Sequence, residues 1–597
     1  LGIRAMARQR ALLRRLRAAE TLGAATVVCT DKTGTLTQNQ MTVQKIWLPN
    51  AEISVTGVGY DPAGHFEIAG EKIDYRQRND LLALLESGSH CNHSRLVKDD
   101  QGWHEMGEPT ESALIVAAYK AWLDTEHQPN SVIEFSFNST RKRMTIVKRN
   151  GDCLTAHSKG APEVLIPRCS QVLDGKQIRP MTIEDRQNAV AAFTKMAENG
   201  LRTLAVARRE LPSDCSLDDE CVETELTLLG VVGMMDPPRP EVSHAIDLAR
   251  TAGIRVLMIT GDSAITATAI ANQIGLQARR AIVGDELTDL DDESLGLALQ
   301  EDVIFARTTP EHKLRIVNLL QGQGHVVAMT GDGVNDAPAL KKADVGISMG
   351  KRGTDVAKGA SDIVLTDDNF SSIIGAVEEG RRQFDNIQKF VRYLLSSNAG
   401  EVVAIFLNIL VGGPLILLPV QILWMNLVTD GMTAVALGLE PAEKSIMQRP
   451  PRNPTEAVLN RSGIWMILGF GAYVGLATLW LFHFYLGGES AEDLALAQTM
   501  AFTGIIVIEK ANVLNFRSIS SPLSTIGWLA NPWILVAIAF TFGLQICAVY
   551  VPFLQDALHT VPLRFSDWML ILAVSAPVFV VPEIIKWFGS GAKIDSE

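Results

Sequence analysis

The sequence predicts three parts: an α/β domain, an α+β domain inserted into it, and an all-α membrane domain of six helices that follows them. Two observations support this. Charged residues are scattered along the chain up to about residue 385, and long apolar runs dominate beyond that point. Before that point, apolar stretches typical of buried strands each end in a short polar turn. A chain of 597 residues is also too long for one hydrophobic core.

The basic N-terminal segment and the overall charge limit the choice of partners. Residues 1–20 lack the apolar core and the cleavage site of a signal peptide, and we expect them to form a helical cytoplasmic stalk segment next to a membrane. The net charge of the whole chain is −13. Because nucleic-acid binders carry a basic face, we predict no nucleic-acid partner.

Three apolar stretches predict parallel strands. They are residues 25–29 before Asp31, residues 255–259 before Thr260-Gly-Asp262, and residues 325–329 before the run 330–336, TGDGVND. The carboxyl ends of parallel strands meet at one edge of a doubly wound sheet, so the three turns should converge. About two hundred residues after the first strand leave room for an inserted domain. The expected parts are a stalk segment at 1–20, the α/β domain at 21–38 and 236–380, the inserted domain at 39–235 and the membrane domain at 381–597.

Six apolar segments in the C-terminal part are long enough to cross a bilayer. They lie near 388–411, 415–438, 464–486, 495–514, 533–553 and 567–588. Several tryptophans fall at depths typical of membrane interfaces. The sequence therefore predicts an integral, multi-pass membrane protein whose other domains lie on the cytoplasmic side.

Asp31 has the setting of a nucleophile. An aspartate at a strand end, followed by Lys-Thr-Gly-Thr, suits attack on the terminal phosphate of ATP and formation of an acylphosphate. Such chemistry needs Mg²⁺ and donors for the phosphate oxygens. The expected catalytic residues are Asp31, Lys32, Thr33, Thr260, Gly261, Asp262, Lys313 and Asn335, and the expected magnesium ligands are Asp31, Thr33, Asp332 and Asp336.

Thr33 bears on the lifetime of the acylphosphate. Related phosphatases have an aspartate two places after the nucleophile, and it acts as general acid and then activates water. Thr33 cannot do this, so we expect a phosphoenzyme that lasts until another group arrives. A conformational pump needs such an intermediate, and a plain phosphatase does not.

Five ordered motifs resemble those of the P-type ATPases. They are 31–37 (DKTGTLT), 159–163 (KGAPE), 236–239 (DPPR), 260–262 (TGD) and 330–336 (TGDGVND). The resemblance implies that the α/β domain is a phosphorylation domain of the HAD-like kind, and that the insert binds ATP, with Phe137 stacked on adenine. The nucleotide-binding residues that it implies are Glu111, Phe137, Lys159, Gly160, Arg202, Asp236, Arg239 and Arg307.

Polar side chains within the spans predict what is transported, because such residues are costly in a bilayer. Their carboxylate and amide oxygens suit calcium. The set resembles the sites of type II calcium pumps of the sarco/endoplasmic reticulum kind, and Lys510 beside Glu509 departs from it: turned inward, Lys510 could replace an ion, and otherwise it faces headgroups or a partner helix. The expected cation ligands are Asn398, Glu401, Asn426, Thr429, Asp430 and Glu509.

Alternatives remain at this point. A sodium/potassium-type or manganese-type type II pump would use similar ligands, and a membrane-tethered HAD phosphatase without transport would share the fold. No Thr-Gly-Glu run occurs, and the resemblance implies an actuator domain that has one. We therefore expect a fragment that lacks the actuator domain and the first four transmembrane helices, which the missing N-terminal half of the same pump would supply, and that is not competent for full turnover. Its expected location is a bacterial plasma membrane.

Overall fold

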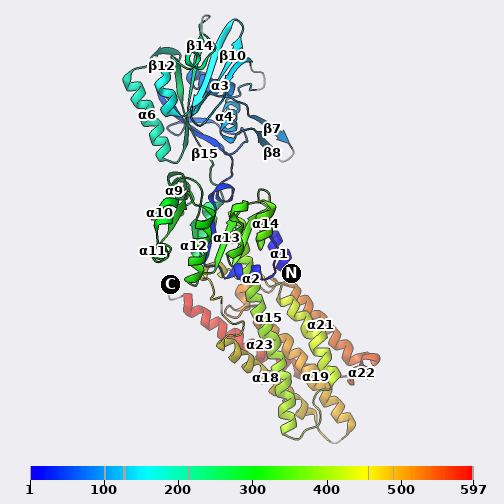
Figure 1. The fold of residues 1–597 in the computed structure, drawn as a ribbon. Helices are drawn as coiled ribbons and strands as arrows, with labels where there is room; N and C mark the ends of the chain where they lie inside the picture. The colour runs from blue at the N-terminus through cyan, green and yellow to red at the C-terminus, as the bar shows by residue number, and fades with distance from the viewer. Residues whose placement is uncertain are drawn as a thin grey trace. The chain divides into compact units, whose positions relative to one another are not determined.

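The computed structural model describes residues 2–99, 102–125, 129–212, 216–454, 456–488 and 490–594 (Figure 1). The chain divides into two compact units. The strand-rich unit comprises Val27–Arg250 and Arg255–Ser371. The helical unit comprises Leu1–Thr26, Thr251–Ile254 and Ser372–Glu597. This arrangement confirms the predicted fold class of sheet domains followed by a bundle of membrane-spanning helices.

The strand-rich unit contains a parallel sheet of five strands, in the order β21-β20-β19-β2-β16. Nearly every residue of these strands is buried, which explains their continuous apolar sequences. A parallel pair, β17 and β18, lies beside them. The strands are β2 (Val27–Thr30), β16 (Arg255–Met258), β17 (Arg280–Val283), β18 (Val303–Ala306), β19 (Val327–Gly331), β20 (Val345–Met349) and β21 (Ile363–Leu365).

Helices alternate with these strands, as the predicted doubly wound pattern requires. Leu257, Phe305 and Val327 belong to the apolar core that the strands share with the helices. The helical elements are η1 (Lys32–Leu36), α8 (Val242–Thr251), α9 (Ala264–Gln273), α10 (Gly284–Asp289), α11 (Asp292–Ala298), α12 (Pro310–Gly322), η4 (Val334–Asp336), α13 (Ala337–Lys342) and α14 (Asp355–Ala360).

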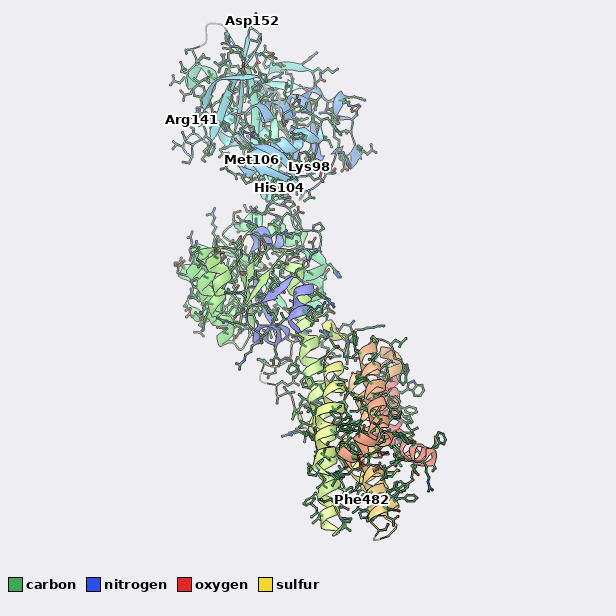
Figure 2. All side chains as sticks on the ribbon, turned by 90° about the vertical axis from the view of Figure 1, so that its right-hand side faces the viewer. Lys98, His104, Met106, Arg141, Asp152 and Phe482 are labelled. Atoms are coloured by element: carbon green, nitrogen blue, oxygen red, sulfur yellow. The ribbon has the colours of Figure 1, made fainter. Side chains whose placement is uncertain are left out.

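A mostly antiparallel sheet of eleven strands is inserted after β2. Its main path is β6-β5-β4-β3-β15-β14-β11-β10-β9, and a branch begins at β12, which pairs in parallel with β15 and antiparallel with β13. The strands are β3 (Thr42–Leu48), β4 (Ala51–Val55), β5 (Phe66–Ile68), β6 (Glu71–Lys72), β9 (Asn130–Phe135), β10 (Arg143–Asn150), β11 (Cys153–Gly160), β12 (Cys169–Asp174), β13 (Gln177–Pro180), β14 (Arg202–Leu211) and β15 (Leu226–Met235). A separate hairpin, β7 (Arg95–Asp99) and β8 (Gly102–Met106), carries Lys98, His104 and Met106 (Figure 2).

Helices cover this insert. The sheet and helices α3 and α4 share one apolar core, which includes Ile46, Leu84 and Leu114. Helix α6 closes a second core with Ala189 and Met196. The helical elements are η2 (Tyr75–Gln77), α3 (Asn79–His90), α4 (Pro109–Lys120), α5 (Pro162–Leu165), η3 (Ile166–Arg168), α6 (Ile183–Glu198) and α7 (Asp219–Val222).

The N-terminal segment differs from the expected continuous stalk helix. It forms α1 (Gly2–Arg8), a three-residue strand β1 (Ala11–Leu13) and α2 (Arg17–Gly23). Arg10 has a φ of 60°, and this left-handed conformation ends the helical path after α1. Helix α2 lies close against α15 (Phe370–Leu410), where a Cβ at Gly23 would come within 2.6 Å of the backbone of Gly380. Glycine therefore permits this close approach.

Among the residues that the structure describes, six helical segments of the helical unit are long and apolar enough to span a membrane, which confirms the predicted number. They are 370–410, 419–437, 461–485, 491–517, 532–550 and 565–588. Phe482 of the third segment is buried in an apolar core to which the fourth segment also contributes (Figure 2). The elements are α15 (Phe370–Leu410), α16 (Pro419–Trp424), η5 (Met425–Asp430), α17 (Gly431–Leu437), η6 (Ile446–Gln448), α18 (Arg461–Tyr485), α19 (Ala491–Val513), η7 (Leu514–Arg517), α20 (Leu523–Ile526), α21 (Pro532–Tyr550), α22 (Pro552–Leu558) and α23 (Phe565–Ile594).

Helix α15 is longer than the predicted first span, because a charged N-terminal half precedes its apolar half. The expected boundary at residue 380 falls inside this helix. Within the helical unit, Arg381 donates to the backbone oxygens of Ile446 and Arg449, and Lys389 pairs with Glu443 at 3.2 Å. These contacts attach the loop between the second and third spans to α15.

Candidate active site and membrane cluster

Asp31 lies directly after strand β2, which pairs with β19 and β16, at the carboxyl edge of the parallel sheet. Its Oδ2 accepts from Lys313 Nζ at 2.7 Å, and its backbone N–H donates to Thr330 Oγ1 at 3.0 Å. Lys313 lies near the start of α12, which Thr309 caps and Pro310 begins. Thr330 comes from β19. Segments almost 300 residues apart therefore meet at Asp31, as the strand pattern predicts.

The turn after Asp31 has a conformation that depends on glycine. Gly34 has a φ of 73°, and a Cβ there would lie 1.5 Å from a guanidinium nitrogen of Arg352. This turn brings Thr33 Oγ1 to 3.5 Å from Asp262 Oδ2 and forms an ion pair between Lys32 and Asp262. The turns after β2 and β16 are therefore joined by side chains.

Lys313 is buried between two carboxylates. It contacts Asp31 at 2.7 Å and Asp336 Oδ1 at 2.8 Å. Burial alone would lower the pKa of Lys313, but the charges of Asp31 and Asp336 outweigh it and hold the pKa above its ordinary value. Burial, together with the nearby charge of Asp31, raises the pKa of Asp332. Lys313 therefore remains a fixed positive charge beside the nucleophile.

The two expected magnesium ligands of the third turn differ in their contacts. Asp336 Oδ2 accepts from the backbone N–H groups of Asp332 and Gly333 at 3.1 and 3.0 Å, while Oδ1 accepts from Lys313. Asp336 thus orders this turn. Asp332 is half-buried, with its nearest guanidinium, that of Arg352, at 3.8 Å. The carboxylates of Asp31 and Asp332 and the hydroxyl of Thr33 are the hard oxygen donors that Mg²⁺ prefers, so the residues present fit that ion.

The remaining expected catalytic residues lie on the same edge. Thr260 is buried, and its Oγ1 accepts from the backbone N–H of Asp262 at 3.2 Å. Gly261 and Asn335 are exposed in their turns. Thr330 and Arg352 also reach the site, and sequence reasoning did not single them out. Thr330 lies in a recognised motif, whereas Arg352 carries no signal apart from its charge.

The insert contains a pocket of about 620 Å³. Phe137 projects into it with 60% of its side chain exposed. A large aromatic face left open in a pocket is available for stacking. Five of the expected nucleotide-binding residues are among those that line this pocket: Glu111, Phe137, Lys159, Gly160 and Arg202.

Lys159 and Glu111 form a buried ion pair at the pocket wall. Their N–O distance is 2.6 Å, and Lys159 also donates to the backbone oxygen of Cys91. Burial would raise the pKa of Glu111, but Lys159 and the backbone N–H of His93 outweigh it, so this pKa is lowered. Gly160 is required by packing, since a Cβ there would lie 2.7 Å from that of Arg143 on β10.

Three expected nucleotide-binding residues lie outside this pocket. Asp236 accepts from Thr37 Oγ1 at 2.5 Å, and Arg239 donates to the backbone oxygen of Gly34 at 3.3 Å. Both lie where the chain returns from the insert, beside the turn after Asp31. Arg307 has a φ of 50°, and its backbone N–H donates to the carbonyl of Asp262.

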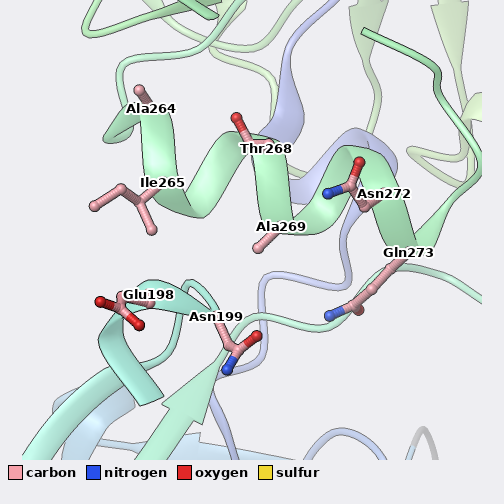
Figure 3. Close-up of a pocket in the computed structure, with 8 residues that line it drawn as sticks. All are labelled: Glu198, Asn199, Ala264, Ile265, Thr268, Ala269, Asn272 and Gln273. Atoms are coloured by element: carbon pink, nitrogen blue, oxygen red, sulfur yellow. The ribbon is translucent and has the colours of Figure 1, made fainter. Parts of the chain in front are cut away.

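Another hollow, of about 510 Å³, lies between α9 and the end of α6 (Figure 3). Figure 3 shows Thr268 and Asn272 on α9, with Glu198 and Asn199 opposite. None of the expected site residues lines it. We therefore infer no catalytic or binding role for this hollow from its size alone.

The helical unit brings together three carboxylates from three spans. Oxygens of Glu401, Asp430 and Glu509 lie within 4.8 Å of one another, and all three side chains are buried. Asn426 Nδ2 donates to both carboxylate oxygens of Glu401, at 3.2 and 3.1 Å. Neither carboxylate oxygen of Glu509 has a hydrogen-bond partner among the described residues. This group is called the carboxylate cluster below.

Lys510 points into the protein, which resolves the question left open by the sequence. Its Nζ contacts Asp430 Oδ1 at 2.6 Å, Tyr393 Oη at 3.0 Å and Thr433 Oγ1 at 3.4 Å. Only 3% of Lys510 is exposed. The ammonium group is therefore part of the same buried polar region as the carboxylate cluster.

The other expected cation ligands are placed differently. Asn398 is exposed. Thr429 is buried and donates to the backbone oxygen of Met425 at 2.9 Å. The second span changes to π-helical turns over Met425–Asp430, and such turns commonly occur at functional sites.

Two family models match the chain. One, described as the cation-transporting ATPase C-terminus, matches residues 414–588. The other, described as the cytoplasmic domain N of P-type ATPases, matches residues 80–241. The first covers five of the six spans, and the second covers most of the insert, including the pocket that contains Phe137.

Curated relatives match nearly the whole chain. A calcium-transporting ATPase of Bacillus subtilis is 42% identical over 97% of this chain and 66% of its own length. An endoplasmic reticulum calcium ATPase of Aspergillus fumigatus is 38% identical over 98% of this chain and 68% of its own length. An endoplasmic reticulum-type calcium-transporting ATPase of Arabidopsis thaliana is 36% identical over 99% of this chain and 65% of its own length. The chain thus spans about two thirds of the length of these relatives.

Proposed function

Because this chain belongs to the P-type cation-transporting ATPases, we propose that it carries the catalytic and cation-binding parts of a pump that moves calcium across a membrane at the expense of ATP. The observation that carries this proposal is the buried carboxylate cluster in the same chain as Asp31. Ionisable groups within spans are costly unless they serve a function. The chain is a multi-pass membrane protein, and a bacterial plasma membrane is its proposed location.

The proposed chemical step takes place at Asp31. A carboxylate oxygen of Asp31 attacks the γ-phosphorus of ATP, the bond from that phosphorus to the β–γ bridging oxygen breaks, and ADP leaves with the electron pair. Lys313, 2.7 Å from Asp31, offsets the negative charge that gathers there. Thr260 and Asn335 are the proposed donors to the phosphate oxygens. Mg²⁺, when bound by Asp31, Asp332 and Thr33, would supply further neutralisation of phosphate charge.

The acylphosphate formed in this way is proposed to be long-lived. Thr33 stands where a phosphatase has its general acid, and a threonine hydroxyl is a poor proton donor and acceptor at neutral pH. Its contact with Asp262 further holds it in place. This argues against the alternative of a membrane-tethered phosphatase without transport.

The proposed nucleotide site is the pocket of the insert. Phe137 offers an exposed face for adenine, and Arg202 and Lys159 offer positive charge along the wall. Asp236, Arg239 and Arg307 lie nearer the turn after Asp31 and are proposed to act on the nucleotide from there. Glu111 is proposed to orient Lys159 within the pocket, through their 2.6 Å ion pair.

Calcium is the proposed cargo because the cluster offers hard oxygen ligands. Glu401, Asp430 and Glu509 supply carboxylates, and Asn426 supplies an amide oxygen once its side chain turns. The names of the relatives from Bacillus subtilis and Aspergillus fumigatus favour the same ion. Manganese uses similar ligands and remains the second candidate.

ATP-driven uptake of ⁴⁵Ca²⁺ into membrane vesicles, made from cells that produce the protein containing this chain, tests the proposal. Asp31→Asn should abolish both uptake and the hydroxylamine-sensitive ³²P label from [γ-³²P]ATP. Asp152→Asn changes an exposed aspartate of the insert and should alter neither. Calcium uptake that persists in Asp31→Asn would refute the proposal. A rate of phosphate release that does not depend on any divalent cation would favour a phosphatase.

A further inference from the structure

The charges of the carboxylate cluster are not balanced within it. Glu401, Asp430 and Glu509 are three carboxylates, and their nearest buried cation is the Lys510 ammonium. With all three carboxylates ionised, three negative charges against one positive charge leave two negative charges in a buried region of the spans. Uncompensated charge in such a region is costly. The remaining charge matches one divalent cation.

The two oxygens of Asp430 have different surroundings. Oδ1 accepts from Lys510 Nζ at 2.6 Å and from Tyr393 Oη at 3.1 Å. Oδ2 is buried and has no hydrogen-bond partner among the described residues. Asp430 therefore has one oxygen that is saturated by an ammonium group and another that is available to a ligand.

Glu509, like Oδ2 of Asp430, indicates that the cluster binds a ligand. Its side chain is fully buried, and neither carboxylate oxygen accepts a hydrogen bond from an N–H or hydroxyl group within the described part of the chain. An oxygen of this group lies within 4.8 Å of oxygens of Glu401 and Asp430. A buried carboxylate without a donor is strongly disfavoured, and a metal ion satisfies it.

We propose that Lys510 is a tethered cation that takes the place of one ion, so that the cluster binds a single divalent cation between Glu401, Glu509 and Oδ2 of Asp430. This inference rests on the proposed function and specifies how many ions the site takes. Lys510 is held on the other side of Asp430 by Tyr393 and Thr433. A second divalent cation beside Oδ1 would meet this ammonium at contact distance and be repelled.

The inference is tested by counting bound calcium. Equilibrium binding of ⁴⁵Ca²⁺ to the purified protein is compared with the number of sites that become ³²P-labelled at Asp31. The wild type should bind one calcium ion per phosphorylation site, and the calcium dependence of phosphorylation should have a Hill coefficient of one. Two calcium ions per site in the wild type would overturn the inference.

Substitutions at Lys510 test the cause. Lys510→Met removes the repulsion between the ammonium and the bound ion, and should lower the half-saturating calcium concentration at least about tenfold or admit a second ion. Lys510→Arg keeps the charge and should keep the wild-type count. Lys586→Met removes a mostly buried lysine of the last span, which is bound to Glu583 instead, and should leave the count unchanged.

The outcomes separate this inference from the proposed function. If Lys510→Met retains the wild-type count and the wild-type half-saturating concentration, Lys510 is only an internal ion-pair partner and the inference fails. If calcium-dependent phosphorylation occurs with two ions bound, the inference fails and the pump remains. If no ⁴⁵Ca²⁺ binds and calcium does not affect phosphorylation, both fail. Should Lys510→Met not fold, the wild-type count and Lys510→Arg still decide.

Discussion

At the scale of single residues, the site depends on where charge is placed. Lys313 is held between Asp31 and Asp336, and Lys510 is held on Asp430 by Tyr393 and Thr433. In each place one buried ammonium group contacts one oxygen of an aspartate and leaves the other oxygen to a different partner. On Asp31 the proposed partner is the phosphorus of ATP, and on Asp430 it is a cation.

Lys313→Met should reduce phosphorylation of Asp31 by about 10²- to 10³-fold, because the positive charge that offsets the reacting groups is lost. Nucleotide binding should change little, since the pocket of the insert does not include this residue. Initial rates of ³²P incorporation and binding of a fluorescent ATP analogue measure the two effects. Lys358→Met, at a half-buried site on α14, is the control. A phosphorylation rate within twofold of the wild type would contradict the role of Lys313.

Phe137→Ala should weaken binding of ATP by about 1–3 kcal/mol, the usual value of one base–aromatic stack. Because 60% of Phe137 is exposed, its loss should leave the melting temperature of the insert unchanged. Trp122→Ala removes a larger exposed aromatic residue outside the pocket and should not affect ATP binding. Calorimetric titration with ATP measures both variants, and equal affinities for wild type and Phe137→Ala would exclude stacking at this residue.

The sequence revealed some of these residues and not others. Asp31 and Lys313 lie in motifs whose chemistry follows from the residue types and their place at strand ends. Arg352 reaches the site only because the chain folds back toward the turn at Gly34, and local sequence cannot show this. The direction in which the Lys510 side chain points could not be predicted either, because it depends on packing among three helices. Asn398 was expected to face the cluster and is exposed, although helical spacing places it near Glu401.

At the scale of elements, strand ends and helix irregularities position the functional groups. The parallel sheet was predictable because its buried strands are continuous apolar runs. The N-terminal segment was not, because a basic amphipathic pattern does not reveal the left-handed residue Arg10 that interrupts it. The π-helical turn Met425–Asp430 was also not predictable in detail.

The insert contains a pair of adjoining histidines that should make its stability depend on pH. The ring centroids of His157 and His90 lie 4.8 Å apart with the rings edge to face, and burial, followed by the charge of His90, lowers the pKa of His157 to about 3. In the unfolded chain, His157 binds a proton with a pKa near 6.5. Its contribution to the free energy of unfolding is therefore fully present above that pH and is lost as the pH falls toward 3. The contribution of His157 to the free energy of unfolding should be lower by about 2 kcal/mol at pH 5 than at pH 8.

Hydrogen exchange of the insert between pH 8 and pH 5 measures this effect after correction for the intrinsic rates. His157→Gln removes the titrating group and should flatten the pH dependence. His104→Gln, on the exposed β7–β8 hairpin, should not. If wild type and His157→Gln lose stability in parallel, another group is responsible.

At the scale of the whole molecule, each unit carries one half of the proposed cycle, and buried polar contacts join the spans of the helical unit. Arg517 is fully buried and donates to Glu440 Oε1 at 3.0 and 2.9 Å, while Asn531 donates to Glu440 Oε2 at 2.7 Å. Glu440 follows the second span, Arg517 ends the fourth, and Asn531 precedes the fifth. The number of spans followed from hydropathy, whereas this network depends on residues that are distant in sequence.

Glu440→Ala should destabilise the helical unit by about 3–5 kcal/mol, because the buried charge of Arg517 loses its partner. The thermal midpoint of the purified protein in detergent measures this change. Glu456→Ala, in the loop before the third span, removes an exposed carboxylate and serves as the control. An unchanged midpoint in Glu440→Ala would show that Arg517 is neutralised in another way.

The central claim is that a cation held by the membrane carboxylates permits phosphorylation of Asp31. Its most direct test is a calcium titration of the ³²P-phosphoenzyme in wild type and in Glu401→Gln, which retains the shape of a side chain only 6% exposed. We predict that Glu401→Gln raises the half-saturating calcium concentration at least about tenfold, with ATP affinity unchanged. Identical calcium dependence in the two proteins, or phosphorylation that needs no divalent cation beyond Mg²⁺, would contradict the claim.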